Sequence, residues 1–291
     1  MTLAFSSNDT GEGTSSPSSL VFTPSDWDTP QTITLTGQDD NLEDGDQPYQ
    51  IVFSAIVSGD ADYAGIVPGP VLVFNTDNDT AGFEVSEASG PTREDGETAT
   101  FNVRLRTQPS DDVTISFSSS DTGEGTLGQS NLTFTTLNWD SFQTVTLTGQ
   151  DDELADGNQP YQVTFGSSTS NDTNYAGITP SSVNVLNLDD DSAGFLISSP
   201  SSPTTEDGTQ ATFTVRLQSE PQSSVTLTYF SNDTTEGTLN VSSINFSPSN
   251  WDSPQTVTVT GVDDELADGD QSYRIIFAAA ISSDANYNGL I

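Results

Sequence analysis

The sequence contains no cysteine and no histidine, and all five of its basic residues are arginine, so it also has no lysine. These absences exclude disulfide bridges, zinc fingers, thiol nucleophiles and Ser-His-Asp triads. They also exclude Schiff-base chemistry and a P-loop lysine. The site chemistries that remain are those of paired carboxylates and of metals bound through oxygen.

Positive charge is scarce: 43 acidic residues face 5 basic ones, which gives a formal net charge of −38 at pH 7. Nucleic acid and anionic membranes are repelled by such a chain, so we expect neither as a partner. The same charge opposes compaction unless cations neutralise it. Because 32% of the residues are hydrophobic and many lie in alternating runs, we predict folded domains and not an acidic disordered chain.

Long hydrophobic runs are missing as well. No segment approaches the length needed to span a bilayer, and Met1–Phe5 lacks the charged start and apolar core of a signal peptide. The surface composition, rich in Ser, Thr, Asn and Asp, favours an extracellular or cell-surface location. Any export signal is then expected to lie outside this sequence.

One acidic segment recurs at a fixed spacing of 112 residues, as Asp39–Tyr49, Asp151–Tyr161 and Asp263–Tyr273. A period of that length indicates tandem copies of one domain. We predict a partial repeat over residues 1–80 that lacks its first strands, a complete repeat over 81–192, and a repeat over 193–291 that lacks its last strand. The chain is then a window from a longer array, or its open ends are completed head to tail by neighbouring subunits through strand addition.

The middle copy shows the pattern of one repeat. Ala99–Arg106 alternates, with Phe101, Val103 and Leu105 on one face, as in a half-buried strand. Further strands are predicted at Val113–Phe117, Asn131–Thr135, Phe142–Thr148, Tyr161–Phe165, Val183–Asn187 and Gly194–Ile197. No window has a helical period, and about seven short strands per repeat predict an all-β fold of antiparallel, Ig-like sandwiches. The connections between copies are short and acidic, so the sandwiches should follow end to end.

Four acidic segments of the middle copy follow predicted strands or precede them, and in an antiparallel sandwich such loops collect at one pole. They are Glu94-Asp95, Asp121 with Glu124, Asp151-Asp152 with Asp156, and Asp189-Asp190-Asp191. Clustered carboxylates without basic neighbours repel one another strongly. Ca²⁺ resolves this repulsion by taking about 6–8 oxygen ligands, and it suits a site without imidazole or thiolate better than zinc or copper.

The same residues resemble a known family, the Calx-β repeats of sodium–calcium exchangers and bacterial surface proteins. The resemblance rests on Glu94-Asp95-Gly96 before Ala99–Val103, on Gln143–Leu147 followed by Asp151-Asp152 and Gly157, and on Val183–Val185 followed by Asp189–Asp191. It covers the whole chain and implies a calcium-binding sandwich. The ligands it implies are Glu94, Asp121, Asp151, Asp152, Asp189, Asp190 and Asp191, and Asp156 is added because it recurs in all three copies.

The outer copies carry the corresponding candidate ligands. They are Asp9, Asp39, Asp40, Asp44, Asp77 and Asp79 in the first copy, and Glu206, Asp233, Asp263, Asp264 and Asp268 in the third. Asn78 replaces one carboxylate of the first copy, which should weaken its site. Only the middle copy is expected to hold a complete set.

These patterns predict a non-catalytic structural protein: a calcium-stiffened stalk of a surface adhesin or a subunit of an extracellular fibre, whose partners are neighbouring repeats or subunits. An alternative is a carbohydrate-binding module that uses Trp27, Trp139 and Trp251, which share one repeat position. Packing at a strand entrance is the favoured interpretation of these tryptophans, because a predicted strand follows each of them directly. Glycosidase-like catalysis by paired carboxylates is disfavoured, because the same acids repeat in every unit without a surrounding Arg, Tyr or His constellation.

Overall fold

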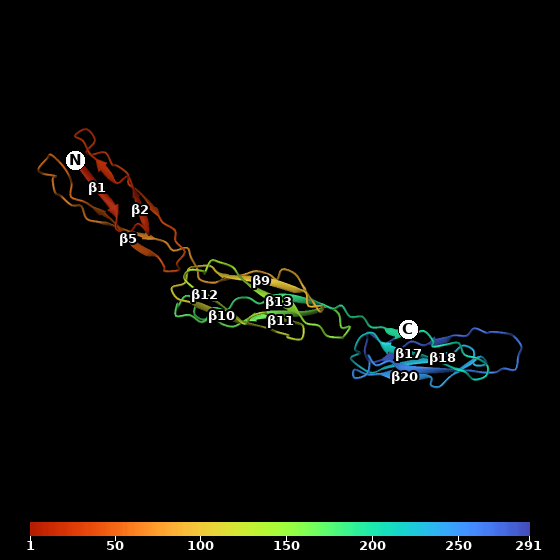
Figure 1. The fold of residues 1–291 in the computed structure, drawn as a ribbon. Helices are drawn as coiled ribbons and strands as arrows, with labels where there is room; N and C mark the ends of the chain where they lie inside the picture. Colours follow the sequence, from red (N-terminus) through yellow and green to blue (C-terminus); the bar gives the residue numbers. More distant parts are fainter.

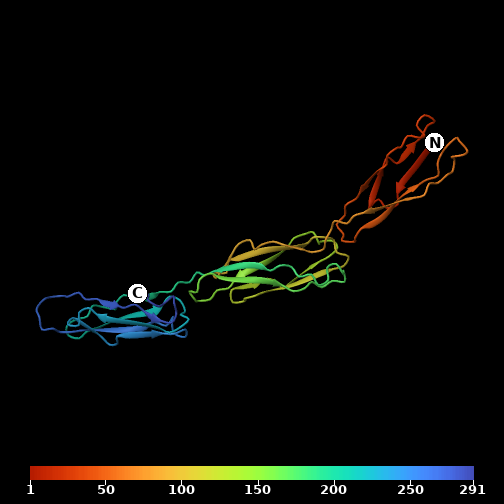
Figure 2. The ribbon, with the colours of Figure 1, turned by 180° about the vertical axis from the view of Figure 1, so that it is seen from behind.

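A computed structural model describes all of residues 1–291, and it contains strands, turns and loops but no helix. Three β-sandwich bodies follow one another in an extended array, with the first inclined to the other two (Figure 1). The view from behind shows the same arrangement (Figure 2). We call residues 1–80, 81–192 and 193–291 the first, middle and third repeat. No helix of residues 1–291 is long and apolar enough to cross a membrane.

Two facing sheets form the middle repeat. One has the strand order β12-β10-β14-β15-β8 and the other the order β11-β13-β9-β7. All pairings are antiparallel except that of β15 with β8, which is parallel. The strands are β7 (Phe83–Val85), β8 (Thr92–Arg93), β9 (Thr98–Leu105), β10 (Val113–Ser119), β11 (Gly125–Leu127), β12 (Asn131–Phe134), β13 (Gln143–Gly149), β14 (Gln159–Phe165) and β15 (Val183–Leu188).

The outer repeats contain parts of the same pattern. The first repeat pairs β3-β1-β5-β6 in one sheet and β2-β4 in another, and its strands are β1 (Thr2–Ser7), β2 (Gly13–Ser16), β3 (Ser19–Val21), β4 (Thr34–Gly37), β5 (Gln47–Phe53) and β6 (Val71–Asn75). The third repeat has the orders β16-β17-β21-β19 and β20-β18-β22, with β23 also paired to β18. Its strands are β16 (Phe195–Ile197), β17 (Gln210–Leu217), β18 (Val225–Ser231), β19 (Gly237–Leu239), β20 (Ser243–Phe246), β21 (Gln255–Gly261), β22 (Ile275–Phe277) and β23 (Ile281–Ser282).

The predicted all-β sandwich fold is confirmed, and so is the alternation along β9. Phe101, Val103 and Leu105 are at most 1% exposed and form the core between the two sheets with Ile115 and Leu147. The side chains that alternate with them along β9 face outward, because successive side chains of a strand point to opposite faces of the sheet. Seventeen buried residues make up this core, compared with twelve in the third repeat and four in the first. Most of the hydrophobic stabilisation therefore lies in the middle and third repeats.

A tyrosine packs against a glycine near one end of each sandwich. A Cβ atom on Gly125 would lie 2.2 Å from the Cζ atom of Tyr161, so only glycine allows the ring this close. The hydroxyl group of Tyr161 lies 3.2 Å from Oγ1 of Thr92, in β8. Gly13 with Tyr49 and Gly237 with Tyr273 repeat the arrangement. The buried tyrosine thus helps to place the short strand β8, which leads into the acidic end of the repeat.

Candidate metal centre

The parallel pairing of β8 with β15 brings two distant acidic segments together. Thr92 and Arg93 pair with Asn187 and Leu188, so the chain leaves both strands at the same end of the sheet. The next residue after β8 is Glu94, whose backbone N–H donates to the carbonyl oxygen of Leu188 (3.1 Å). In return, a carboxylate oxygen of Glu94 accepts a hydrogen bond from the Asp190 backbone N–H (3.3 Å). Two residues of β8 are therefore enough to place Glu94 beside the aspartates that follow β15.

Glu94, Asp189 and Asp191 form one compact carboxylate group, with one oxygen of each within 4.8 Å of the others. Glu94 is only 3% exposed. Burial, the largest cause, and the charges of Asp189, Asp152 and Glu124 together raise the pKa of Glu94 to about 7, although the hydrogen bond from the Asp190 backbone N–H lowers it. Burial also raises the pKa of Asp191 to about 6, with smaller contributions from neighbouring carboxylates. These groups are destabilised as anions unless a cation joins them.

A second carboxylate group lies next to the first and is made by Glu124, Asp152 and Asp156. Burial raises the pKa of Glu124, and the charges of Asp156, Asp152 and Asp121 add to the shift, against a hydrogen bond from Asn187. The Oδ1 atom of Asp156 is buried and has no hydrogen-bond partner. Because Asp152 acts on both Glu94 and Glu124, the two groups form one continuous acidic centre. A buried carboxylate oxygen without a donor is costly, and a cation would satisfy it.

Equivalent residues come together in the outer repeats. The groups whose oxygens lie within 4.8 Å of one another are Glu12, Asp40 and Asp44 in the first repeat, and Glu206, Asp264 and Asp268 in the third. The first repeat has a small pocket of about 20 Å³ here, lined by polar residues and glycine only. Its volume is enough for one water molecule or ion, which needs roughly 10–15 Å³. Burial and the charges of Asp39, Asp77 and Asp40 raise the pKa of Asp79 beside this pocket.

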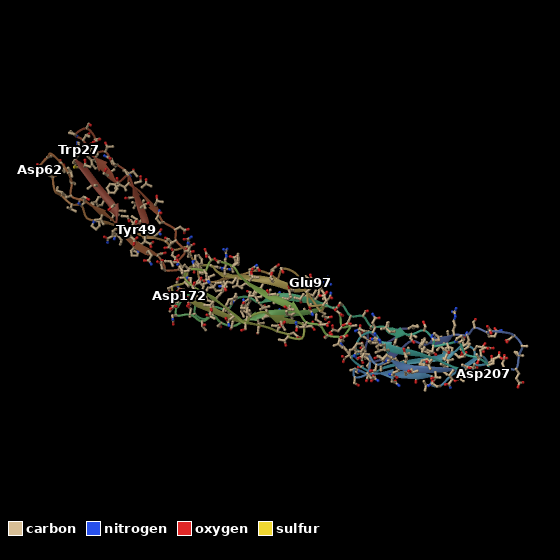
Figure 3. The ribbon with its side chains drawn as sticks, viewed as in Figure 1. Trp27, Tyr49, Asp62, Glu97, Asp172 and Asp207 are labelled. Atoms are coloured by element: carbon tan, nitrogen blue, oxygen red, sulfur yellow. The ribbon has the colours of Figure 1, made fainter.

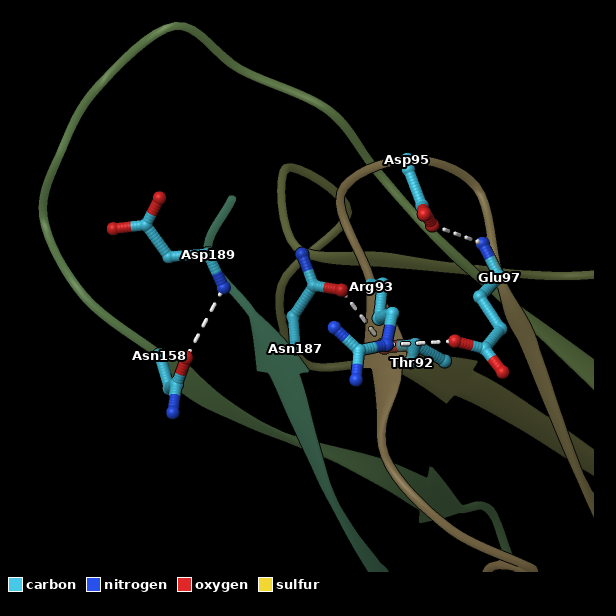
Figure 4. Close-up of polar contacts among 7 residues, drawn as sticks. All are labelled: Thr92, Arg93, Asp95, Glu97, Asn158, Asn187 and Asp189. Carbon is cyan, nitrogen blue, oxygen red and sulfur yellow. Dashed lines mark hydrogen bonds and ion pairs between the residues drawn. The ribbon is translucent and has the colours of Figure 1, made fainter. Parts of the chain in front are cut away.

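No basic side chain enters the acidic centre of the middle repeat. The nearest candidate by sequence, Arg93, forms an ion pair with Glu97 (2.7 Å), as Figure 4 shows. The same view shows the backbone N–H of Asp189 donating to Asn158 (3.1 Å) and Thr92 donating to Asn187 (2.9 Å). The only other ion pair of the molecule joins Arg104 to Glu84. The acidic centre thus has ordered backbone around it but no counter-charge.

Some predicted ligands instead accept hydrogen bonds from the backbone of their own turns. Oδ1 of Asp121 accepts a hydrogen bond from the backbone N–H of Gly123 (2.9 Å), and Asp9 and Asp233 cap the same turn in the outer repeats. None of these three aspartates belongs to a compact carboxylate group. The glutamate three residues later does: Glu12 is in the compact group of the first repeat, and Glu124 is in the second carboxylate group of the middle repeat. The sequence signal for Glu124 was its recurrence as Glu12 and Glu236. Glu236 has a raised pKa too, caused by burial and then by Asp264, Asp268, Asp233 and Glu206.

Asp189 and Asp152 combine two roles. The carboxylate of Asp189 accepts hydrogen bonds from the backbone N–H groups of Gly157 (2.5 Å) and Asp191 (2.7 Å), which ties the acidic loop to the end of β15. In the first repeat Asp77 accepts from Gly45 and Asp79 in the same way. Oδ1 of Asp152 accepts from the backbone N–H of Leu154 (2.7 Å). Of the other predicted ligands, Asp39, Asp151, Asp190 and Asp263 are exposed and lie outside the compact groups.

The acidic loops of the first and middle repeats also contact the repeat that follows. Across the first joint, the backbone N–H of Gln108 donates to the carbonyl of Asn41 (2.7 Å), and the side-chain amide of Asn174 donates to the carbonyl of Glu43 (2.6 Å). Asp172 orients this Asn174 by accepting its backbone N–H (2.9 Å). Figure 3 shows Asp172 at the end of the middle repeat that faces the first, and Glu97 at the opposite end.

The second joint repeats these contacts. The backbone N–H of Glu220 donates to the carbonyl of Glu153 (2.6 Å), and the amide of Asn286 donates to the carbonyl of Ala155 (2.5 Å). Each donor and each acceptor is 112 residues after its counterpart at the first joint. The two joints are therefore built in the same way, and in both the contact surface is the loop that carries the acidic residues.

The three tryptophans do not share one environment. Trp139 and Trp251 are partly buried against their repeat cores, and their carbonyls accept the backbone N–H groups of Leu105 and Leu217. Trp27 is 67% exposed, near the outer end of the first repeat (Figure 3). The packing interpretation thus fits two of the three positions, and only one indole ring is free to stack on a sugar.

Comparison with known proteins gives neither a matching family model nor a matching curated protein. Among solved structures, CBD12 from CALX1.2 is similar over 67% of this chain and 79% of its own, with 15% identity and a TM-score of 0.31. The calcium binding domain CBD12 of CALX1.1 has 16% identity and a TM-score of 0.32, over 66% and 77% of the two chains. Domains 4–9 of the surface layer protein SbsC match 96% of this chain and 38% of theirs, with 13% identity and a TM-score of 0.28. At these values, function has to be inferred from the chain's own residues.

Proposed function

We propose that this chain is a non-catalytic, calcium-binding array in which Ca²⁺ ions at the acidic ends of the repeats stiffen the joints. The observation that carries the proposal is the buried carboxylate of Glu94 beside Asp189 and Asp191, with no basic side chain in reach. Such an array suits a mechanical role outside the cell, as the stalk of a surface adhesin or a subunit of an extracellular fibre.

A cation would balance the negative charge of the acidic centre. Buried carboxylates need a partner, because an unpaired charge away from water is strongly disfavoured. Only two ion pairs exist in the molecule, and both lie outside the acidic centre. The buried Oδ1 atom of Asp156 has no hydrogen-bond partner either, and a positive ion would stabilise it as it would stabilise Glu94.

Calcium fits the available ligands best. They are all carboxylate oxygen atoms on loops, which suits Ca²⁺ with its irregular shell of about 6–8 ligands. Mg²⁺ prefers a strict octahedron and keeps several waters, and the softer transition metals prefer nitrogen or sulfur. In the middle repeat Glu94, Glu124, Asp152, Asp156, Asp189 and Asp191 would hold the ions.

The link from ion binding to stiffness runs through the acidic loop. Residues 151–157 carry Asp152 and Asp156 on the acidic side, and the carbonyls of Glu153 and Ala155 accept hydrogen bonds from the third repeat. An ion that orders this loop therefore also orders the contact surface of the joint. Binding that occurs only in the ordered state stabilises that state by mass action.

A catalytic role is not proposed, because the acidic groups recur in all three repeats and are joined to structural contacts of the backbone. A carbohydrate-binding function remains the alternative, and its support is the single exposed ring of Trp27.

Calcium titration by isothermal calorimetry tests the proposal. Glu94→Gln removes the buried charge, and Glu97→Gln makes the same chemical change three residues away, at an exposed ion pair with Arg93. We expect the Glu94→Gln variant to bind at least one ion fewer per chain, or to bind the tightest ion at least about tenfold more weakly, a change of ~1.4 kcal/mol. The Glu97→Gln variant should match the unmodified chain. Identical titrations for both variants, or no heat of binding at millimolar Ca²⁺, would refute a calcium centre at Glu94.

A further inference from the structure

Asn187 is a fully buried amide near the end of β15, two residues before Asp189. Its Oδ1 atom accepts a hydrogen bond from the hydroxyl group of Thr92 (2.9 Å), as Figure 4 shows. Its Nδ2 atom donates to the carbonyl oxygen of Gln150 (3.0 Å) and to the carboxylate Oε2 atom of Glu124 (3.3 Å). The three contacts correspond to the carbonyl oxygen and the two N–H groups that an amide side chain offers.

These contacts join four separate segments at the acidic end of the middle repeat. Asn187 belongs to β15 and Thr92 to β8, whereas Glu124 directly precedes β11. Gln150 follows β13 and begins the acidic loop, residues 151–157. The backbone N–H of Gln150 also donates to the carbonyl oxygen of Glu124 (3.1 Å). The start of the acidic loop and Glu124 are therefore held to each other directly and, through Asn187, to the central strands.

A glycine makes room for this amide. A Cβ atom on Gly149 would lie 2.7 Å from Oδ1 of Asn187, and closer still to the carbonyl oxygen of Arg93 in β8. In the first repeat a Cβ atom on Gly37 would overlap Oδ1 of Asn75 in the same way. Both repeats thus have the glycine that lets the amide approach the end of the neighbouring sheet.

The first repeat contains the same arrangement around Asn75. Its Nδ2 atom donates to the carbonyl oxygen of Gln38 (2.7 Å) and to Oε2 of Glu12 (3.2 Å). Gln38 in turn donates its backbone N–H to the carbonyl oxygen of Glu12 (3.0 Å). Glu12 is a member of the compact carboxylate group with Asp40 and Asp44. In both repeats, one buried or half-buried amide therefore contacts the glutamate that lies at the acidic centre.

An amide suits this place because it can orient a carboxylate without adding charge. An arginine here would neutralise Glu124 and compete with a bound cation, and an aspartate would repel Glu124. A hydrogen bond to a charged carboxylate is shorter and stronger than one between neutral groups. Partners that orient metal ligands in this way change metal affinity by about 10–100-fold when they are removed.

We propose that Asn187 is the positioning residue of the calcium centre, which holds the Glu124 carboxylate and the start of the acidic loop in their binding arrangement before an ion arrives. The inference rests on the proposed function and adds to it a residue that does not contact the ion. Ligands that are already ordered lose less conformational freedom on binding, so the amide increases calcium affinity. Asn75 has the same role in the first repeat.

The calcium-dependent stabilisation of the middle repeat tests this role. Urea unfolding is followed by the fluorescence of Trp139 in a full chain with Trp27 and Trp251 replaced by phenylalanine, in EDTA and at increasing Ca²⁺. The increase in stability with Ca²⁺ gives the affinity of the middle repeat. Asn187→Leu keeps the branched shape but has no hydrogen-bonding group, and we expect about tenfold weaker binding or more, ~1.4 kcal/mol less stabilisation. Asn75→Leu makes the same change in the first repeat and should leave the affinity of the middle repeat within about twofold.

A second set of variants separates positioning from a merely structural role. Thr92→Val removes the donor to Asn187, and Thr107→Val removes a buried hydroxyl near the opposite end of the repeat, 2.8 Å from the hydroxyl of Tyr175. Both variants should lower the stability in EDTA. Only Thr92→Val should also weaken calcium binding, by about threefold or more, and Thr92→Ser, which keeps the donor, should restore it. These variants decide the question if Asn187→Leu does not fold.

The outcomes distinguish this inference from the proposed function. If Ca²⁺ does not stabilise the middle repeat of the unmodified chain, the proposed function fails and the positioning role fails with it. If Ca²⁺ stabilises the unmodified chain, and Asn187→Leu and Thr92→Val by the same amount, only the positioning role is refuted. A Thr107→Val variant that loses as much calcium affinity as Thr92→Val would also contradict it, because the effect would then follow from lost stability alone.

Discussion

The metal-free chain should lose stability as the pH rises from about 4.5 to 7.5. Glu94 has its folded-state pKa raised from 4.5 to about 7, and that of Asp191 is raised from 3.8 to about 6. A raised folded pKa means that the folded state binds more protons than the unfolded state between the two values. The stability contributed by these protons is present below about pH 4.5 and is lost as the pH rises through 7. Acids with lowered pKa values, such as Asp77, titrate below 3.8 and outside this window.

The expected size of this loss follows from the shift of Glu94. One pKa unit corresponds to about 1.36 kcal/mol, so the shift of Glu94 from 4.5 to about 7 by itself contributes at most about 3 kcal/mol, and Asp191 adds to this loss. The actual loss of stability should be smaller than this figure, because solvent screens the repulsion between Glu94 and the exposed carboxylates near it. In excess Ca²⁺ the slope should reverse, since the ion binds the deprotonated carboxylates and competes with protons. The free energy of unfolding should then increase with pH over the same range.

Urea unfolding of the middle repeat measures this directly. Each repeat contains one tryptophan, so replacing Trp27 and Trp251 with phenylalanine leaves Trp139 to report on the middle repeat alone. Curves are recorded at pH 4.5, 6 and 7.5 in EDTA and in excess Ca²⁺. Glu94→Gln should make the EDTA profile less steep, leaving the contribution of Asp191, and Glu97→Gln should leave it unchanged. A metal-free stability that increases from pH 4.5 to 7.5, or a Glu94→Gln profile as steep as the original, would refute this reasoning.

Three further predictions concern packing, the joint and the calcium effect. Gly125→Ala should destabilise the middle repeat by about 1–3 kcal/mol in urea unfolding, because a Cβ atom would overlap the Tyr161 ring. Asn286→Asp should loosen the second joint, because a carboxylate cannot donate a hydrogen bond to the Ala155 carbonyl. The distribution of interatomic distances from small-angle scattering should become broader, and the melting temperatures of the two flanking repeats should not change. A profile equal to that of the unmodified chain would show that this bond does not hold the joint. EDTA should lower the melting temperature of the unmodified chain by more than that of the Glu94→Gln variant. Calorimetric scans measure both decreases.

The sandwich fold was predictable because it depends on patterns that a sequence shows directly. The alternation along β9 identifies the buried face, and the 112-residue recurrence identifies the repeat. Strand ends agreed within a few residues, but β8 and β11 were not predicted. They have two and three residues, and such short strands carry no period. Their positions depend on pairing with β15 and β13, which is a property of the folded sheet.

The candidate site was predictable as a set of acidic segments but not as an arrangement. Sequence alone does not show that β8 runs parallel to β15, and this pairing is what buries Glu94 beside Asp189. It also does not separate Asp121, which caps its own turn, from Glu124, which faces the acidic centre. Both residues recur in every repeat, and only the backbone geometry of the turn distinguishes them.

The joint contacts could not be predicted either. Asn174 and the carbonyl of Glu43 are 131 residues apart, and the acceptor is a backbone atom whose residue type varies between the copies. The first repeat has Asp62 at the position of this asparagine, so its outer end lacks the amide that both joints use. The substitution becomes meaningful only once the folded array shows what the asparagine does.

The central claim is that calcium stiffens the joints, and a distance measurement across one joint tests it most directly. The chain has no cysteine, so Thr146→Cys and Thr256→Cys provide two unique spin-label sites on exposed strand positions of the middle and third repeats. Double electron–electron resonance in Ca²⁺ should give one narrow distance distribution that broadens in EDTA. A control pair within the third repeat, at Ser243 and Thr256, should stay narrow in both. A cross-joint distribution of equal width with and without Ca²⁺ would contradict the account.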